Sequence, residues 1–159
     1  MYSDTSSSRT FHDQWTPHLL SVLRVVAGFL FMVHGTQKLF GWPMPMGGGG
    51  PIDVTSLIGM AGLMEVVGGA LMVVGLLTRP VAFLLSGEMA FAYFTRHAPR
   101  DFWPLANGGE LAALYCFLFL YFSVAGAGPW SIDAWLRSQR SARQRPPIGV
   151  EHAHAGRGA

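Results

Sequence analysis

Apolar residues concentrate in four stretches along the chain, at residues 19–40, 56–77, 80–96 and 109–127. A helix needs about 20 residues to cross a hydrocarbon core of ~30 Å, and the first, second and fourth stretches reach this length. Residues 111–132 contain no charged side chain, a pattern typical of a membrane span. The pattern therefore predicts an all-α integral membrane protein built as a four-helix bundle.

Ionisable side chains interrupt the first three stretches at His34, Glu65 and Glu88. A charged residue at bilayer depth costs roughly 2.5 to 3.5 kcal/mol on insertion scales. Counted at ~1.5 Å per residue from the outer end of each span, the three side chains share a similar depth in the outer half of the membrane. Lys38 lies close above them. We therefore expect these groups to meet inside the protein.

Helical periodicity places several distinctive residues of the first stretch on one stripe, which we expect to face inward: Arg24, Gly28, Phe31, His34, Gly35 and Lys38. In the second stretch Gly62 and Gly69 lie on either side of Glu65, and such small residues let helices approach closely in lipid. We interpret Arg24, near the inner boundary, as a residue that snorkels to the interface.

Charge and tryptophan positions support a membrane location and give an orientation. Charged residues make up 13% of the chain, against ~25% in an average soluble protein. All five tryptophans lie outside the predicted spans, as in an interfacial belt. Arginines dominate the side of the termini (Arg9, Arg24, Arg79, Arg137, Arg140, Arg143, Arg145 and Arg157), whereas Lys38, Arg96 and Arg100 lie on the other. This bias predicts a multi-pass membrane protein with both termini in the cytoplasm.

The segments outside the spans differ from them in composition. Residues 1–18 and 141–159 are polar and predict disordered tails. Residues 128–140 combine an apolar face with arginines, which indicates an interfacial helix on anionic lipid or, equally, a helix end with ordinary topogenic arginines. Residues 41–55 contain four consecutive glycines and predict a flexible linker, with a mobile lid as the alternative. Residues 78–80 predict a tight turn.

Each candidate site residue has a structural alternative. Glu65 either handles protons or simply pairs with Lys38 or His34 as an interhelical bridge. Glu88 has fewer cationic partners at its depth, so we expect it to hold a proton or share one with Glu65. Asn107 and Glu110 have the spacing of a capping box at the start of the fourth span. Alternatively, this helix start offers hydrogen-bond donors to an oxyanion or a quinone carbonyl.

Four segments together resemble the DoxX family of membrane proteins, related to the DoxD-type subunit of thiosulfate:quinone oxidoreductase. They are LRVVAGFLFMVHGTQK (23–38), GLMEVVGGALMVVGLLTRP (62–80), FWPLANGGELAALY (102–115) and GPWSIDAW (128–135). The resemblance covers residues 19–136. It implies a four-helix inner-membrane protein linked to redox or sulfur metabolism, and it transfers no catalytic residues.

No cofactor is encoded by recognisable ligands, and we expect no metal site. Cys116 is the only thiol, which excludes an internal dithiol cycle. A membrane quinone fits the remaining redox chemistry, because its reduction needs protons that buried carboxylic acids can deliver. In this hypothesis Glu65, Glu88 and His34 are catalytic and Lys38, Asn107 and Glu110 bind substrate. The apolar lining would include aromatic residues, namely Phe31, Phe91 and Tyr93.

The expected partners are membrane lipids, a soluble or membrane redox protein and a second copy of the chain, with no nucleic acid. A non-catalytic alternative is a scaffold or anchor that holds a soluble oxidoreductase through the basic C-terminal tail. A third is a pathway for protons or a small solute, although four helices leave little room for one in a monomer.

Overall fold

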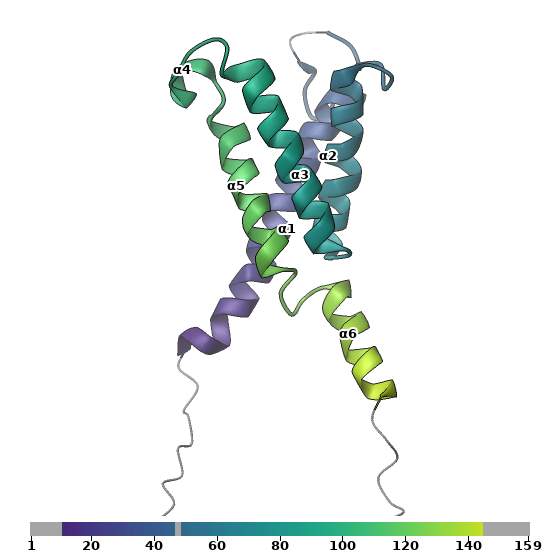
Figure 1. The fold of residues 1–159 in the computed structure, drawn as a ribbon. Helices are drawn as coiled ribbons and strands as arrows, with labels where there is room; N and C mark the ends of the chain where they lie inside the picture. Colours follow the sequence, from purple (N-terminus) through teal and green to yellow (C-terminus); the bar gives the residue numbers. More distant parts are fainter. Residues whose placement is uncertain (1–10, 47–48, 145–159) are drawn as a thin grey trace, which may run out of the picture.

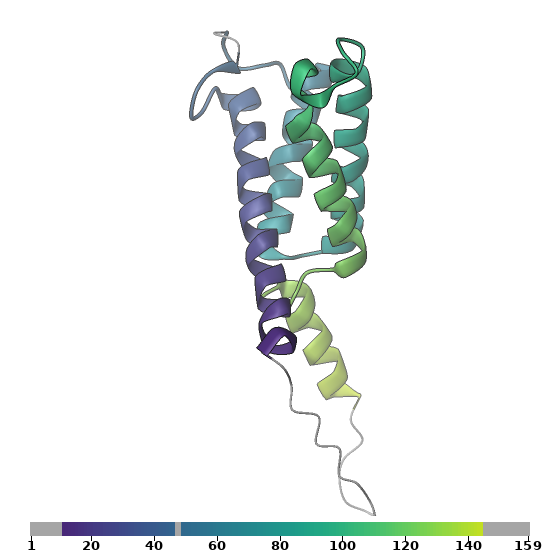
Figure 2. The same ribbon diagram turned by 90° about the vertical axis from the view of Figure 1, so that its left-hand side faces the viewer.

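The computed structural model describes residues 11–46 and 49–144, which are helical with irregular connections and contain no strand. The helices are α1 (Phe11–Phe40), α2 (Leu57–Val74), α3 (Thr78–Ala92) with a π-helical turn (Tyr93–His97), α4 (Pro104–Asn107), α5 (Glu110–Ala125) and α6 (Ile132–Arg143). Helices α1, α2, α3 and α5 lie side by side (Figures 1 and 2). Short α4 lies at one end of these helices, the α4 end, and α6 projects from the other, the α6 end. The predicted all-α class is confirmed.

Two of these helices are long and apolar enough to cross a membrane, namely α2 and the part of α1 at Asp13–Phe40. Helix α5 is apolar but shorter, with 16 residues. Helix α3 has 15 residues and gains five more in the π-helical turn. The second, third and fourth predicted spans therefore correspond to α2, to α3 with its π turn and to α5.

Glycines on facing stripes bring α1 and α2 into the closest contact in the molecule. A Cβ atom on Gly35 would lie 2.5 Å from the carbonyl oxygen of Gly62, and one on Gly28 would lie 2.9 Å from that of Gly69. At this separation no side chain fits between the helices, as is usual where helices associate in lipid. The predicted inward stripe of the first helix and the role of the two α2 glycines are confirmed.

Aromatic rings join this pair to α3 and α5. Phe31 of α1 contacts Phe119 of α5 edge-on, with ring centroids 4.8 Å apart, and also contacts Tyr115 at 5.1 Å. Leu85 of α3 and Met72 of α2 are buried in the same core. Edge-to-face contacts of this kind add to the stability gained from apolar burial.

Three predicted boundaries differ from the structure. Helix α1 starts at Phe11, so residues 11–18 extend the helix instead of forming a tail; His18 there packs edge-on against Trp130, with centroids 5.1 Å apart. Helix α6 likewise continues to Arg143. The turn between α2 and α3 lies at residues 75–77, because Gly75 adopts a left-handed conformation (φ 69°) and ends α2, whereas residues 78–80 form the first turn of α3. Residues 1–10 and 145–159 of the predicted tails lie outside the described residues.

The connection before α2 is held by hydrogen bonds in its second half. The amide of Ile52 donates to the carbonyl of Lys38 at 2.9 Å, and Ser56 caps α2 by accepting from the Gly59 amide at 3.0 Å. Hydrogen bonds from the amide and hydroxyl of Thr55 lower the pKa of the Asp53 carboxyl. The predicted flexible linker is thus ordered over Ile52 to Ser56, and Gly47 and Gly48 lie outside the described residues.

Arg24 is fully buried at the α6 end and does not snorkel. Its guanidinium donates to four backbone carbonyls, those of Met72 and Val73 in the last turn of α2 and those of Ala127 and Trp130 after α5. The carbonyls in the last turn of a helix lack intrahelical partners, so a cation there is well placed. The sequence-based interpretation of Arg24 is therefore wrong, since this side chain joins α1, α2 and the α5–α6 connection.

Asp133 fastens the start of α6 to the turn between α2 and α3. Its carboxylate accepts from the amides of Leu77 and Thr78, both at 2.9 Å, and its own amide donates to the carbonyl of Gly75 at 2.9 Å. Beyond this point α6 points away from the other helices (Figures 1 and 2). The side chain thus supplies an N-terminal cap for α3 from a distant segment.

Removing this cap with Asp133→Ala is expected to cost about 0.5 to 2 kcal/mol of stability, the usual range for a lost cap. Hydrogen exchange at the Leu77 and Thr78 amides should become faster, because both donors lose their acceptor. Ser138→Ala, in the exposed part of α6, is the control and should leave these amides unchanged. Unaltered protection of both amides in Asp133→Ala would contradict the assignment.

Candidate functional site

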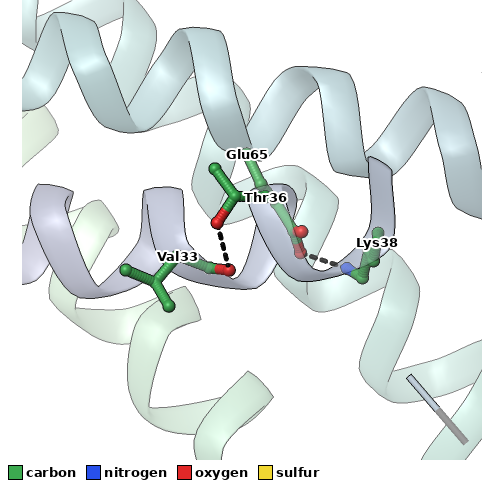
Figure 3. A network of polar contacts seen from close by, with 4 residues as sticks. All are labelled: Val33, Thr36, Lys38 and Glu65. Carbon is green, nitrogen blue, oxygen red and sulfur yellow. Dashed lines mark hydrogen bonds and ion pairs between the residues drawn. The ribbon is translucent and has the colours of Figure 1, made fainter. Parts of the chain in front are cut away.

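The ionisable residues predicted at one depth come together between the helices near the α4 end. Lys38, in the last turn of α1, forms an ion pair with Glu65 in the middle of α2 (Figure 3). The Lys38 side chain is 16% exposed and that of Glu65 is 3% exposed. Gly62 makes the pairing possible, because a Cβ on this glycine would lie 3.0 Å from the Cβ of Lys38. The interhelical bridge considered for Glu65 is therefore present.

The ion pair does not satisfy the whole Glu65 carboxylate. Oε1 contacts Lys38, whereas Oε2 is buried and has no hydrogen-bond partner among the residues described. The neighbouring hydroxyl of Thr36 is directed to the carbonyl of Val33, at 2.9 Å, and so is not a donor to Glu65 (Figure 3). One buried acceptor atom therefore remains available to a proton or a ligand.

Glu88 of α3 contributes a second carboxyl group. It lies close enough to Glu65 and Lys38 for their charges to interact. Both of its carboxyl oxygens are buried, and neither has a hydrogen-bond partner within the described part of the chain. Burying a carboxylate without a donor is costly, so Glu88 is the member of the site best placed to carry a proton.

His34 and Tyr115 complete the cluster. Their rings meet edge-on with centroids 6.2 Å apart, and Tyr115, only 6% exposed, packs against Phe31 and Phe119. His34 lies within the electrostatic range of Lys38, and Tyr115 within that of Glu65. We call His34, Lys38, Glu65, Glu88 and Tyr115 the carboxyl cluster. All four helices that lie side by side contribute to it.

Tyr115 was missed by sequence reasoning. Helical spacing could have identified it, because Tyr115, Phe119 and Phe122 follow one another at intervals of four and three residues and therefore share one face of α5. All three are buried. A tyrosine on an inward stripe brings a hydroxyl into an otherwise apolar interior, and buried tyrosine hydroxyls usually serve as hydrogen-bonding groups.

Asn107 is occupied in the loop before α5. Its side chain donates to the carbonyl of Asp101 at 2.9 Å and accepts from the amide of Gly109 at 2.7 Å. Helix α5 begins after Gly109 without a side-chain cap, so the predicted capping box is wrong. The reason is that Asn107 ends α4, and Gly108 then turns the chain in a left-handed conformation with φ 69°.

Glu110 is exposed and lines a shallow groove of about 760 Å³ on the outside of α5, together with Leu111, Leu114 and Phe117. The structure therefore places Glu110 apart from the carboxyl cluster. Of the three aromatic residues expected to line the site, Phe31 is buried beside Tyr115. Phe91 is 55% exposed, and Tyr93 stacks on His97.

The described residues contain no group of three or more His, Cys, Asp or Glu side chains that could hold a metal ion. The only cysteine, Cys116, is partly buried, and its carbonyl accepts from the Ser86 hydroxyl at 2.8 Å. The carboxyl, imidazole, ammonium and phenol groups of the cluster are able to transfer protons and to form hydrogen bonds.

Comparisons with known proteins identify relatives of this chain. Residues 19–98 match the family model DoxX. An uncharacterized protein of Haemophilus influenzae is 44% identical over 124 residues, which cover 76% of this chain and 92% of the relative. An uncharacterized membrane protein of Mycobacterium tuberculosis is 28% identical over 151 residues, covering 84% and 90% of the two chains. No solved structure matches. The match to the family model spans half of the chain, and this protein belongs to the DoxX family of membrane proteins.

Proposed function

We propose that this protein is a quinone-interacting membrane subunit of a redox or sulfur-metabolism system, similar to thiosulfate:quinone oxidoreductase, in which Glu65 and Glu88 handle protons. The observation that carries the proposal is the pair of buried carboxyl groups, of which one is paired with Lys38, and their three oxygens that lack partners among the residues described. Lys38 can neutralise one carboxylate, so a second negative charge would be uncompensated. The pair is therefore suited to take up and release a proton.

The proposal includes a transmembrane arrangement. Helices α1, α2, α3 and α5 each cross the bacterial inner membrane, and both termini are cytoplasmic. Arginines at the α6 end support this orientation, since Arg79 lies in the first turn of α3 and Arg137, Arg140 and Arg143 lie on α6. Fewer cationic residues (Lys38, Arg96 and Arg100) lie towards the α4 end, which would face the periplasm.

Quinone reduction needs two electrons and two protons, and the cluster can supply the protons. Electrons come from a redox partner protein. His34 and Lys38 donate hydrogen bonds to the ring carbonyls, and Glu88 and Glu65 pass protons to the reduced oxygens. The Asn107 side chain is hydrogen-bonded within its loop, and Glu110 lies outside the carboxyl cluster. The proposal therefore gives these two residues no role in substrate binding.

Matched carboxamide variants test the proposal. We expect Glu88→Gln to lower quinone-coupled turnover with the native redox partner at least tenfold, because an amide cannot deliver the proton. General acids typically accelerate a reaction by about 10² to 10⁴, which sets the size of the expected loss. Glu65→Gln should act in the same direction. Glu110→Gln, on the exposed face of α5, is the control. Full turnover in both cluster variants, with unchanged thermal stability, would refute the proton-handling role.

A scaffold function is the second candidate, because α6 projects from the other helices with three exposed arginines (Figure 1). In this case the protein anchors a soluble oxidoreductase, and lipids or a second copy of the chain complete the assembly. Deleting residues 137–159, which leaves Asp133 in place, would then abolish recovery of the partner, while Glu88→Gln would have no effect. The same assays therefore separate the two candidates.

A further inference from the structure

The side-by-side helices form two close pairs, α1 with α2 and α3 with α5, whereas α2 and α3 contact each other much less. A groove of about 310 Å³ follows the line where α2 and α3 meet, and almost all of its surface is apolar. Its main lining residues are Met64, Val67, Gly68 and Leu71 on α2 and Leu84 and Leu85 on α3.

Gly68 creates the floor of this groove. Leu85 packs onto it so closely that a Cβ on Gly68 would lie 2.6 Å from a Leu85 methyl carbon. Leu85 is 2% exposed, whereas Val67 and Leu84 at the rims are 49% and 60% exposed. The groove therefore has a tightly packed base and opens sideways, towards the acyl chains of a surrounding bilayer.

The groove lies next to the carboxyl cluster along both helices. Glu65 lies three residues from Gly68 on α2, and Glu88 lies three residues from Leu85 on α3, so each carboxyl residue shares a helix face with a residue of the floor. Because α2 and α3 are antiparallel, both steps lead towards the α4 end. The apolar groove thus lies about one helical turn from Glu65 and Glu88, whose three buried carboxyl oxygens lack partners among the described residues.

We propose that the α2–α3 groove binds the polyprenyl chain of a membrane quinone and directs its head group to Glu65 and Glu88. This inference rests on the proposed function. It adds where the polyprenyl chain binds, from which side the quinone enters and which residues contact the polyprenyl chain. The apolar wall requires an apolar ligand segment. The polar end requires a head that hydrogen-bonds inside the membrane, which disfavours a phospholipid because its charged head stays at the bilayer surface. At about 310 Å³ the groove holds only part of a long chain.

Filling the groove tests the proposal. Val67→Trp places a large ring in the groove, and Val26→Trp on α1, where Val26 is 48% exposed, is a matched control at a lipid-facing position outside it. The purified full chain in nanodiscs is titrated with ubiquinone-10 and with the tail-less head group ubiquinone-0, and bound quinone is counted by native mass spectrometry. We expect Val67→Trp to weaken ubiquinone-10 binding at least tenfold and to leave ubiquinone-0 binding unchanged.

The outcomes separate this inference from the proposed function. Full ubiquinone-10 binding in Val67→Trp, or an equal loss in Val26→Trp, would overturn the groove assignment. So would retention of a phospholipid in place of the quinone. If Glu88→Gln weakens binding of both quinones while Val67→Trp changes neither, the head-group site stands without the groove. If the parent binds neither quinone, both proposals fail. Leu84→Trp, on the opposite rim, gives a second measurement in case Val67→Trp does not fold.

Discussion

Arg24→Ala is expected to unfold the α6 end of the protein and to give the largest loss of stability of any single substitution at this end. Arg24 is fully buried, and alanine would remove its hydrogen bonds to four backbone carbonyls, of which that of Met72 also accepts from the Gly75 amide at 3.2 Å. A hydrogen bond to a charged group contributes about 1.5 to 3 kcal/mol, and these contributions are not fully additive, so we expect a loss of more than about 3 kcal/mol. Circular dichroism during thermal unfolding in detergent measures this loss of stability.

Two further variants distinguish the geometry of Arg24 from its charge. Arg24→Lys keeps the positive charge but replaces a planar group of five donors by a single ammonium, which cannot reach carbonyls on both α2 and the α5–α6 connection. We expect it to be intermediate. Arg137→Ala removes an exposed cationic side chain of α6 and should leave the melting temperature nearly unchanged. A stable, monodisperse Arg24→Ala protein would show that these hydrogen bonds do not hold the helices together.

The difference between the expected and observed roles of Arg24 shows what a single sequence encodes. Helical periodicity placed Arg24 correctly on the inward stripe of α1. Its partners are backbone carbonyls 48 to 106 residues away, and every residue carries such a carbonyl, so no side-chain pattern identifies them. Snorkelling was the best local interpretation, and it failed because the interaction is not local.

The carboxyl cluster was more predictable, because its members carry rare chemistry at recognisable positions. Few ionisable residues occur in the apolar stretches, and a count of residues from each helix end was enough to bring His34, Glu65 and Glu88 to one level. Tyr115 was not found by this route, since tyrosine is common near membrane interfaces and gives no signal by composition alone. Asn107 was misplaced because the bonds of a loop side chain depend on the path of the backbone, here the left-handed turn at Gly108.

The two ends of the molecule are built differently, and this difference bears on function. At the α6 end, Arg24 and Asp133 tie α1, α2, α3 and the start of α6 together through backbone groups. At the α4 end, α1 and α2 pack through Gly35 and Gly62, and the polar contacts between helices come from the ionisable side chains of the carboxyl cluster. Polar contacts between helices thus involve backbone groups at the α6 end and ionisable side chains at the α4 end, where binding of a proton or ligand in the proposed function would change them.

Gly35→Ala is expected to force α1 and α2 apart, and its effect should be second only to that of Arg24→Ala. The added Cβ would lie 2.5 Å from the carbonyl oxygen of Gly62 and 2.7 Å from the backbone nitrogen of Val66. These are backbone atoms, so no side-chain rotation relieves the overlap and the helices must separate. Overpacking of this kind costs about 1 to 3 kcal/mol and occasionally more.

Gly87→Ala is the matched control, because a Cβ on this α3 glycine would meet no described atom within 4 Å. In a helix interior alanine is favoured over glycine by about 0.8 to 1 kcal/mol, so Gly87→Ala should be neutral or slightly stabilising where Gly35→Ala is destabilising. The displacement should also reach the cluster. Gly35 lies three residues from Lys38, and Gly62 lies three from Glu65, so a wider helix separation stretches the ion pair that Gly62 allows. The unfolding curve of Gly35→Ala should therefore shift to lower stability while that of Gly87→Ala should not, and coincident curves would show that α1 and α2 do not need their glycines to approach.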